Sequence, residues 1–397
     1  MQSGFLFRAL RAATGVLCSV LAAAAFAQHD PAHFYGPRLV QEGARIAAPG
    51  GYTIAATLLR PEGPGPFGAV VLNHGVPVSD KERAGASSTD LLMSAAVFAR
   101  RGYVVVLPLR RGFGATGGDF AEDTGPCSNP NYMGAEQAAA DDVMAAYLYA
   151  RALPYVDPNR MLLAGHSAGG MVSVFTAGMR QPEGLVAVLA FAAGRGGNPS
   201  LRPGVPCAAE PLARVLDTVG RSIKVPVMFH YAENDLFFNP DTTRFWFKRF
   251  TAGGARAEYV LQPPFGEDGH YMFGDLMGMR YWVPAVESFL AKYDVPFQRL
   301  DSQDPSHESL LAVQKLPHIQ SDGCKGLYRV FLEAPGPRAY AVSQDGRCGF
   351  AGGMSDARDA ALRQCAEVAK GSCALYAVDD AVVWSERSAT ASATLKQ

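Results

Sequence analysis

Residues 160–178 read RMLLAGHSAGGMVSVFTAG, and this stretch decides the fold. The apolar run MLLA at 161–164 is typical of a short buried strand. Apolar residues then recur at helical spacing: Met171, Val172, Phe175 and Met179. The pentapeptide GHSAG at 165–169 lies between the two patterns, so the sequence predicts a sharp turn from a strand into a helix around Ser167.

Such a turn is a nucleophile elbow. Small residues at Gly165 and Gly169 leave room for a strained backbone that lifts the hydroxyl of Ser167 out of the sheet, while the helix starting near Ala168 points free N–H groups at it. The pattern G-x-S-x-G alone is weak evidence, because a chain with 42 glycines among 397 residues matches it by chance about a quarter of the time. The flanking strand and helix therefore carry the interpretation.

The N-terminus has the features of a secretory signal. Arg8 and Arg11 precede an apolar segment at 12–27 that ends in Ala-Phe-Ala, which predicts a signal peptide at 1–27 cut before Gln28. A short membrane anchor is the alternative, but the apolar run is short for a span. We therefore expect an exported protein, periplasmic or secreted, with no membrane span in the mature chain.

Cysteine usage agrees with export. Removing the signal leaves six cysteines: Cys127, Cys207, Cys324, Cys348, Cys365 and Cys373. An even number in an exported chain favours disulfides, and no pair has the C-x-x-C spacing of a structural zinc site, so we expect no metal. The formal net charge of −1 argues against a polyanionic partner such as nucleic acid.

Strands and helices alternate along most of the chain. Residues 39–47 and 52–59 predict an opening antiparallel hairpin across a Pro-Gly-Gly turn. From residue 67 the predicted strands are AVVLN, YVVVLPL, the elbow strand, LVAVLAF, VPVMFHY and AEYVLQ, with helices near 90–101, 134–151, 211–219, 240–252 and 281–293. This alternation predicts an α/β fold: a doubly wound, mostly parallel sheet of about eight strands with its functional loops at the carboxyl edge.

A serine alcohol needs a base, and the base needs a carboxylate that fixes its tautomer. Asp235 follows VPVMFHYAEN, and His270 follows the last strand in FGEDGHYMF, so both lie where this topology places the acid and the base. Glu233 is an alternative acid on the same loop; Asp235 is favoured because Asn234 and Asp235 lie where the loop would turn. Of the other histidines, His166 is adjacent to the serine, His230 lies inside a strand and His74 belongs to another loop. The remaining four lie outside the core: His29, His33, His307 and His318.

Acyl transfer also needs N–H donors for the developing oxyanion. One is expected from the amide of Ala168, directly after the nucleophile. The loop LNHGVP supplies the other, with the amide of Val76 as the candidate and that of Gly75 as the alternative, unless the His-Gly pair forms an ordinary turn.

From about residue 34 to 293, roughly two thirds of the chain, the sequence resembles α/β-hydrolases of the dienelactone hydrolase and prolyl-oligopeptidase-like superfamily. The motifs NHGVP, RRGFGATGGDF, GHSAGG, AENDLFFNP and EDGHYMF fall in the order such proteins show. Dienelactone hydrolases proper use a cysteine nucleophile, whereas this chain has Ser167, so their substrate is not carried over. The resemblance implies a cofactor-free serine hydrolase acting on esters, with amides possible.

Several loop residues are candidates for substrate contact. The aromatic residues Phe237, Phe238 and Tyr271 flank the acid and the base and would suit an apolar or aromatic acyl group, unless they only pack the loops. Arg111 lies at the same edge, near Arg110, Arg195 and Arg202, and would meet a carboxylated substrate unless these arginines are solvated.

The cysteines of two loops at this edge are expected to pair. Cys127 lies in the loop after YVVVLPL, and Cys207 lies in the loop after LVAVLAF, so a bridge would join two walls of the pocket.

The chain changes character after residue 293. Residues 294–321 are polar and read as a linker, and 322–386 predict a small α+β module with a helix at 355–370 capped by Ser355. A module of this size has a small core and is stabilised by disulfide bonds, so we expect the pairs Cys365–Cys373 and Cys324–Cys348. The tail at 387–397 is predicted to be disordered.

These observations favour residues 28–293 as an exported serine hydrolase that cleaves small-molecule carboxylic esters through an acyl-enzyme on Ser167. Two alternatives stay open. One is a serine peptidase or amidase of the prolyl-oligopeptidase-like type. The other is a noncatalytic envelope-binding protein that uses its C-terminal module to contact the cell envelope or a polymer.

Overall fold

The computed structural model describes residues 39–300 and 308–385. The predicted signal peptide and the predicted C-terminal tail lie outside the described residues. Within the described ranges, no helix combines the length and the apolar character that a membrane crossing requires.

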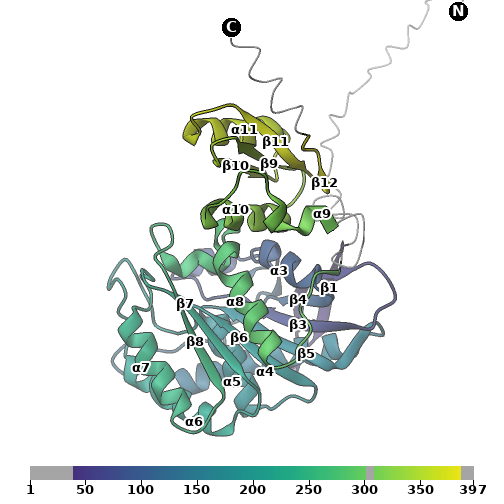
Figure 1. Cartoon of the computed structure of the whole chain (residues 1–397). Coiled ribbons are helices and arrows are strands. Elements are labelled where there is room, and N and C mark those ends of the chain that lie inside the picture. The colour runs from purple at the N-terminus through teal and green to yellow at the C-terminus, as the bar shows by residue number, and fades with distance from the viewer. Residues whose placement is uncertain (1–38, 301–307, 386–397) are drawn as a thin grey trace, which may run out of the picture.

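An eight-stranded sheet forms the centre of the large domain, residues 39–300, in the order β1-β2-β4-β3-β5-β6-β7-β8 (Figure 1). The first two strands form the expected antiparallel hairpin and β2 joins β4 antiparallel, whereas every pairing from β4 to β8 is parallel. The strands are β1 (Leu39–Ala47), β2 (Thr53–Pro61), β3 (Phe67–Asn73), β4 (Tyr103–Pro108), β5 (Val156–His166), β6 (Leu185–Phe191), β7 (Val227–Ala232) and β8 (Ala257–Gln262). The prediction of a doubly wound, mostly parallel α/β-hydrolase sheet is confirmed.

Helices cover both faces of this sheet. One face packs against α3 (Leu92–Ala99) and α8 (Met279–Lys292), and the other packs against α4 (Tyr132–Arg151), α5 (Ala168–Met179), α6 (Ala209–Ser222) and α7 (Pro240–Thr251). Because successive strand residues point to opposite faces, Val70 faces the first layer and Val71 the second. Burial on both faces explains why these strands read as continuous apolar runs.

A short helix, α2 (Asp80–Ala84), was not predicted from the sequence. Its five residues carry no apolar period, and it begins at a capping box in which Ser79 and Glu82 exchange side-chain to backbone hydrogen bonds. Local polar bonds, rather than burial, therefore define this helix.

The C-terminal module, residues 308–385, is a four-stranded antiparallel sheet in the order β10-β9-β11-β12 with one helix on each face. Its elements are α9 (Glu308–Leu311), α10 (Asp322–Glu333), β9 (Arg338–Ser343), β10 (Cys348–Gly352), α11 (Ala357–Val368), β11 (Cys373–Val378) and β12 (Ala381–Val382). Along β9, Tyr340 and Val342 face α10, whereas Ala339 and Ala341 face α11. The predicted small α+β domain is confirmed.

The predicted cap of helix α11 is wrong. The helix begins at Ala357 with Asp356 at the N-cap, and no side chain caps it. Ser355 lies inside a turn in which the N–H of Ala357 donates to the carbonyl of Met354, and this turn delays the start of the helix.

All three predicted disulfides are present. Cys127–Cys207 joins the loops that follow β4 and β6 in the large domain, with the two Cα atoms 5.4 Å apart. Cys324–Cys348 and Cys365–Cys373 both lie within the C-terminal module.

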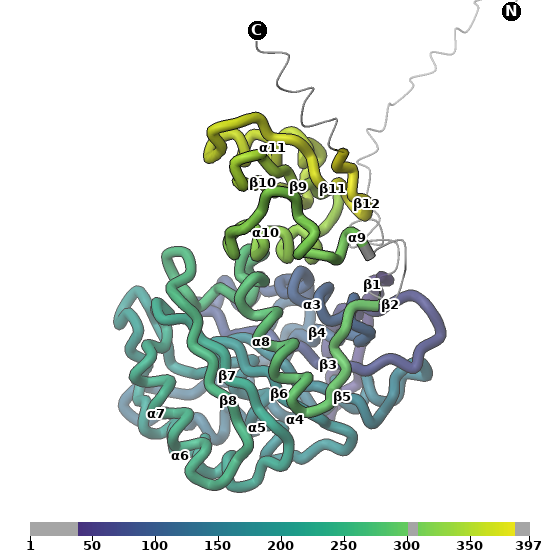
Figure 2. Tube along the Cα trace, viewed as in Figure 1, coloured from purple at the N-terminus to yellow at the C-terminus, as the bar shows by residue number. Residues whose placement is uncertain are grey.

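Helix α10 lies between the small sheet and the large domain in both Figure 1 and Figure 2. At its end the buried carboxylate of Glu333 is 2.8 Å from the guanidinium of Arg101 and 3.2 Å from that of Arg299. Leu276 and Met277, in the turn before α8, also pack against the core of the module. The two units are thus joined by an apolar contact and a buried ion cluster.

The first residues of the predicted linker pack against the large domain, because Val295 and Phe297 are buried in its core.

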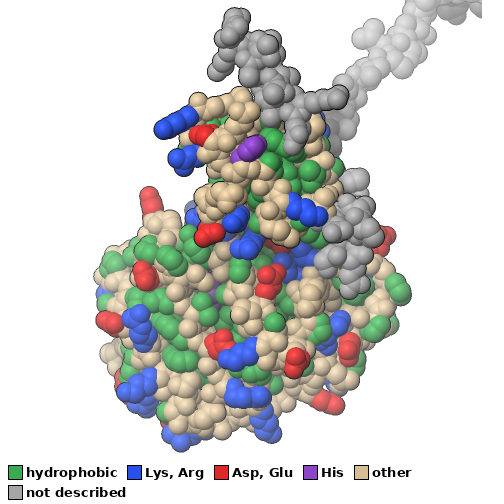
Figure 3. All heavy atoms as spheres, viewed as in Figure 1, with side chains coloured by type: hydrophobic (Ala, Val, Ile, Leu, Met, Phe, Trp, Pro, Cys, Tyr) green, Lys and Arg blue, Asp and Glu red, His purple; other side chains and the backbone are tan. Residues whose placement is uncertain are grey.

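On the face of the large domain turned to the viewer in Figure 3, Lys and Arg side chains are interspersed with Asp and Glu side chains.

Candidate active site

Ser167 connects β5 to α5 with φ 57° and ψ −125°, a conformation that residues other than glycine rarely adopt. Its N–H donates to the carbonyl of Phe191 at 2.8 Å, and its carbonyl accepts from Gly194 at 3.3 Å, so the neighbouring strand holds the turn. This is the backbone geometry of the predicted nucleophile elbow.

The glycines beside the serine are required by close backbone contacts. A Cβ on Gly169 would lie 2.2 Å from the carbonyl oxygen of Asn73, and a Cβ on Gly165 would lie 2.3 Å from the backbone of Gly169. The strand, the helix and the loop after β3 therefore approach each other too closely for any side chain, which gives the G-x-S-x-G spacing a steric cause.

Asp235 and His270 meet at the carboxyl edge of the sheet, on the loops that follow β7 and β8. The Nδ1 of His270 lies 3.0 Å and 3.1 Å from the two carboxylate oxygens of Asp235, and both residues are only 2% exposed. An Nδ1–H donated to the carboxylate leaves Nε2 as the basic nitrogen. Glu233, the alternative acid, is exposed to solvent.

The carboxylate of Asp235 is itself fixed by the backbone. Its Oδ1 accepts the N–H groups of Phe237 at 2.8 Å and Phe238 at 2.9 Å. The Oδ1 of Asp268 accepts from the N–H of His270 and from that of Leu236, both at 2.9 Å, and so ties the acid loop to the histidine turn Gly269–Phe273. The sequence analysis missed Asp268, although an aspartate two residues before a turn residue is a known signal for such a bond.

His166 joins the serine to the histidine turn. Its Nε2 lies 2.7 Å from the carbonyl oxygen of His270, and the two imidazole rings are 4.8 Å apart. Ser167 and His270 therefore lie on segments in direct contact. Among the described residues, the Ser167 hydroxyl has no hydrogen-bond partner, and catalytic hydrogen bonds often form only when substrate is bound.

The loop after β3 lies directly beside the serine. A Cβ on Gly75 would be 3.1 Å from the Cβ of Ser167 and 3.6 Å from its Oγ. The N–H groups of Val76 and Ala168 donate to no oxygen of the described residues, so both are free to bind an oxyanion.

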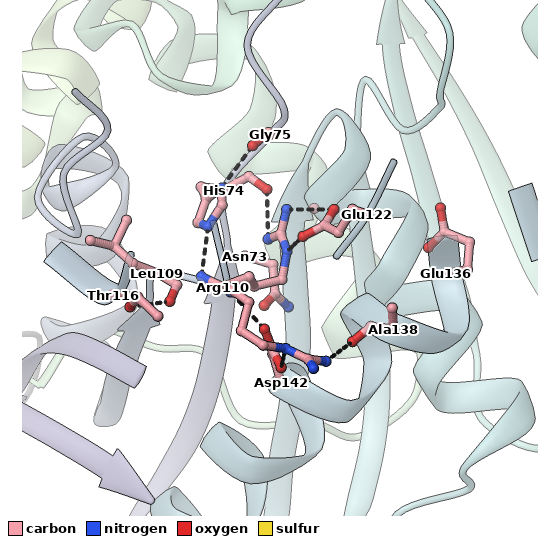
Figure 4. A network of polar contacts seen from close by, with 12 residues as sticks. Asn73, His74, Gly75, Leu109, Arg110, Thr116, Glu122, Glu136, Ala138 and Asp142 are labelled. Carbon is pink, nitrogen blue, oxygen red and sulfur yellow. Dashed lines mark hydrogen bonds and ion pairs between the residues drawn. The ribbon is translucent and has the colours of Figure 1, made fainter. Parts of the chain in front are cut away.

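His74 anchors this loop, as Figure 4 shows. Its Nε2 accepts from the N–H of Arg110 at 3.2 Å, so Nδ1 carries the proton and donates to the carbonyl of Gly75 at 2.7 Å. Burial, aided by the charge of Arg110, lowers the pKa of His74 to about 3 and keeps the ring neutral.

Arg110 in turn belongs to a buried ion network (Figure 4). It donates to the carbonyl of His74 at 2.9 Å and pairs with Glu122, which also pairs with Arg195 at 2.8 Å. Arg195 completes the network with Glu136 at 2.6 Å. Burial alone would raise the pKa of Glu122, but Arg110 and Arg195 together lower it to about 2.

The candidate substrate residues occupy different environments. Phe237 is stacked on the ring of His270, with centroids 4.0 Å apart, and Phe238 packs on Trp246 in the core. Arg111 forms an ion pair with Asp142 at 2.9 Å. Of the four candidates, Tyr271 presents by far the largest exposed surface.

In the described part of the chain, no three His, Cys, Asp or Glu side chains are grouped so that they could hold a metal ion.

Residues 87–192 match the family model of the prolyl oligopeptidase family. No curated protein matches the chain significantly. Three of the solved structures that are similar to it each align with 64% of this chain. A putative dienelactone hydrolase from Klebsiella pneumoniae is 16% identical, with 98% of that chain covered and a TM-score of 0.45. An esterase from Pyrococcus furiosus is 14% identical, with 91% covered and a TM-score of 0.47. An acetyl xylan esterase from Paenibacillus sp. R4 is 17% identical, with 84% covered and a TM-score of 0.47.

The family match contains the nucleophile elbow, and the sheet has the α/β-hydrolase arrangement. Together they support a serine hydrolase of the α/β-hydrolase type, acting on esters or on peptides.

Proposed function

We propose that this protein is an exported serine esterase that hydrolyses carboxylic esters through an acyl-enzyme on Ser167. The observation that carries the proposal is the doubly hydrogen-bonded pair of His270 and Asp235, which lies on a segment in contact with the elbow that presents Ser167. A buried imidazole oriented by a carboxylate is the general base that a serine nucleophile requires.

The reaction runs in two halves. The Oγ of Ser167 attacks the ester carbonyl carbon as its proton passes to Nε2 of His270, and the oxyanion binds the N–H groups of Val76 and Ala168. Collapse of the tetrahedral intermediate breaks the bond to the alcohol, which leaves with the proton from His270. Water then attacks the acyl-enzyme in the same way, releases the carboxylic acid and restores the serine. No cofactor takes part.

The three disulfides and the signal-like N-terminus support export. N-terminal sequencing of the protein recovered outside the cytoplasm tests this part, and we expect it to begin at Gln28.

Hydrolysis of soluble p-nitrophenyl esters by the wild type and by Ser167→Ala tests the catalytic proposal. We expect turnover by the wild type, loss of at least about a thousandfold in Ser167→Ala, and labelling of Ser167 alone by a fluorophosphonate probe. Equal rates for the two proteins would remove the catalytic assignment and favour a noncatalytic envelope-binding protein that uses the C-terminal module.

A peptidase or amidase is the second candidate, because the matching family model is that of the prolyl oligopeptidases. Aminoacyl p-nitroanilides compared with esters of the same acyl group decide between the two. A higher kcat/KM for the anilide would favour the peptidase.

A further inference from the structure

Five large apolar side chains are exposed on loops at the carboxyl edge of the sheet. They are Val78, Leu201, Val205, Leu236 and Tyr271, each between 37% and 74% exposed, and we call them the apolar collar. Other exposed apolar side chains of the described residues lie elsewhere. Leu148, for example, is near the end of α4, which leads to the opposite edge of the sheet. Leu201, Val205 and Leu236 lie on two loops that are hydrogen-bonded to each other, and neighbouring exposed apolar side chains mark a binding surface more often than scattered single residues do.

The collar adjoins the proposed catalytic groups. Leu236 follows Asp235, Tyr271 follows His270, and Val78 lies two residues beyond Val76. Three of the five collar residues are thus within two chain positions of a proposed catalytic or oxyanion-binding residue.

The loop that carries Leu201 and Val205 is bound to the acid loop. The N–H of Gly204 donates to the carbonyl of Leu236 at 2.6 Å, and the N–H of Asn239 donates to the carbonyl of Gly204 at 2.8 Å. These bonds make the two loops one continuous rim.

The rim is also fixed to the body of the domain. The disulfide Cys127–Cys207 ties its base, where the carbonyl of Cys207 accepts from the hydroxyl of Tyr132. The N–H of Cys207 donates to the carbonyl of Gly196 at 2.7 Å. These bonds hold the loops of Leu201, Val205 and Leu236 in place. The exposure of these apolar side chains to water is therefore a fixed feature of the fold, and it costs free energy.

Most of the arginines at this edge are not available to an anionic ligand. Three of the four arginines at this edge are already paired: Arg110 with Glu122, Arg195 with Glu122 and Glu136, and Arg111 with Asp142. The fourth, Arg202, is exposed beside Leu201, and its guanidinium lies 3.1 Å from the Sγ of Cys127. Arg110 and Arg195 are almost fully buried as well, so they offer no guanidinium to a substrate.

We propose that the collar docks the enzyme on the surface of an aggregated, uncharged ester, such as an emulsion droplet, so that ester molecules pass from the droplet to Ser167. This inference rests on the proposed esterase function and narrows its substrate class to water-insoluble neutral esters.

Tributyrin hydrolysis measured across the solubility limit of tributyrin tests the proposal. The wild-type rate is expected to rise above the saturation value reached with dissolved substrate once droplets form. The double variant Leu201→Ser/Val205→Ser should lose this rise, with a ratio of emulsion activity to soluble p-nitrophenyl acetate activity lowered about tenfold, because two aliphatic side chains no longer enter the droplet. Leu148→Ser, a matched exposed leucine on α4, should keep the wild-type ratio.

A binding measurement separates docking from catalysis. The Ser167→Ala protein should sediment with the droplets of a tributyrin emulsion, and adding the two collar substitutions should leave it in the aqueous phase. Two results would overturn the role of the collar alone. One is a rate of tributyrin hydrolysis that still rises in the collar variant once droplets form. The other is a wild-type protein that hydrolyses soluble esters but shows no such rise in rate. A dimer that dissociates when the collar is substituted would also overturn it, by assigning the surface to a second copy of the chain. No turnover of either ester would instead overturn the esterase function on which the inference rests.

Discussion

The Nε2 of His166 donates a hydrogen bond of 2.7 Å to the backbone carbonyl of His270. Because His166 directly precedes Ser167, this bond connects the strand that presents the proposed nucleophile to the turn that carries the proposed base. Burial lowers the pKa of His166 to about 3, so the ring stays neutral and keeps one N–H for this bond.

We therefore expect His166→Leu to lower kcat for a soluble ester by about five- to tenfold, with little change in KM, since a hydrogen bond of this kind contributes about 1 kcal/mol. His166→Gln should recover most of the rate, because its amide nitrogen can donate from a similar position. Steady-state kinetics of both variants check the prediction. Equal losses would mean that the ring matters for packing rather than for the bond.

A second prediction concerns the direction of an oxyanion donor. The carbonyl of Gly75 and the N–H of Val76 belong to one planar peptide and point in opposite directions. Because His74 Nδ1–H holds this carbonyl at 2.7 Å, the ring sets where the N–H of Val76 points.

His74→Asn keeps a donor near the position of Nδ1, whereas His74→Gln places its amide near Nε2 and leaves the carbonyl of Gly75 without its partner. We expect kcat to fall about a hundredfold in the Gln variant, as when an oxyanion donor is lost, and clearly less in the Asn variant. Melting temperatures serve as the control for folding. The reverse order of the two rates would contradict this role.

The sequence was sufficient for the sheet and for the disulfide pairs, and the structure places the predicted acid Asp235 beside His270. Apolar residues recur at clearly different spacings in strands and in helices, so the elements of the sheet can be recognised. The order of the strands alone brings Cys127 and Cys207 to the same edge of the sheet. It did not reveal the roles of His74 and His166, because the direction of a side chain depends on partners far away in the chain. Phe237 illustrates the same limit: its position in the chain does not show that its ring is stacked on His270.

The arginines at this edge show a related difficulty. Arg195 pairs with Glu122 and Glu136, which lie 73 and 59 residues away in the chain, so no local pattern indicates that its charge is already compensated.

A third prediction concerns the attachment of the C-terminal module. Burial alone would raise the pKa of Glu333, but Arg101, Arg299 and Arg100 hold it well below its usual range. Glu333→Gln should lower the free energy of unfolding by about 3 kcal/mol, because it removes the buried carboxylate that the buried guanidinium of Arg101 contacts together with the partly exposed Glu287. Urea denaturation measures this loss, and faster proteolysis between the two units should accompany it.

Glu210→Gln is the matched control, since Glu210 forms only exposed pairs, with Arg249 and Arg214, and should contribute less than about 1 kcal/mol. The sign of the pH effect follows from the lowered pKa of Glu333. The Glu333 carboxylate stabilises the fold at pH values above the ordinary carboxyl pKa, and this stabilisation is lost as the pH falls below that value. The difference in the free energy of unfolding between the wild type and Glu333→Gln should therefore narrow below about pH 4. A gap that widens there would contradict the ion cluster.

The last prediction is a loss of stability in mild acid caused by three buried histidines. Burial is the main cause that lowers the pKa of His74, His166 and His230, each to about 3. Between that value and the ordinary histidine pKa of about 6.5, the unfolded chain binds protons that the folded chain does not. The free energy of unfolding must therefore fall as the pH drops below about 6.5, by up to about 1.4 kcal/mol per pH unit for each histidine.

Urea denaturation at about pH 7 and about pH 5.5 measures this slope above the range in which carboxylates titrate in the unfolded chain. Replacing one histidine should remove about a third of the slope, and His230→Gln is the suitable variant. His230 lies in β7, and its Nε2 accepts from Gln262 at 3.2 Å. The substitution should therefore change the pH dependence of stability while the proposed catalytic groups stay intact. If stability were the same at both pH values, or if His230→Gln left the slope unchanged, these rings would not be neutral and buried in the folded protein.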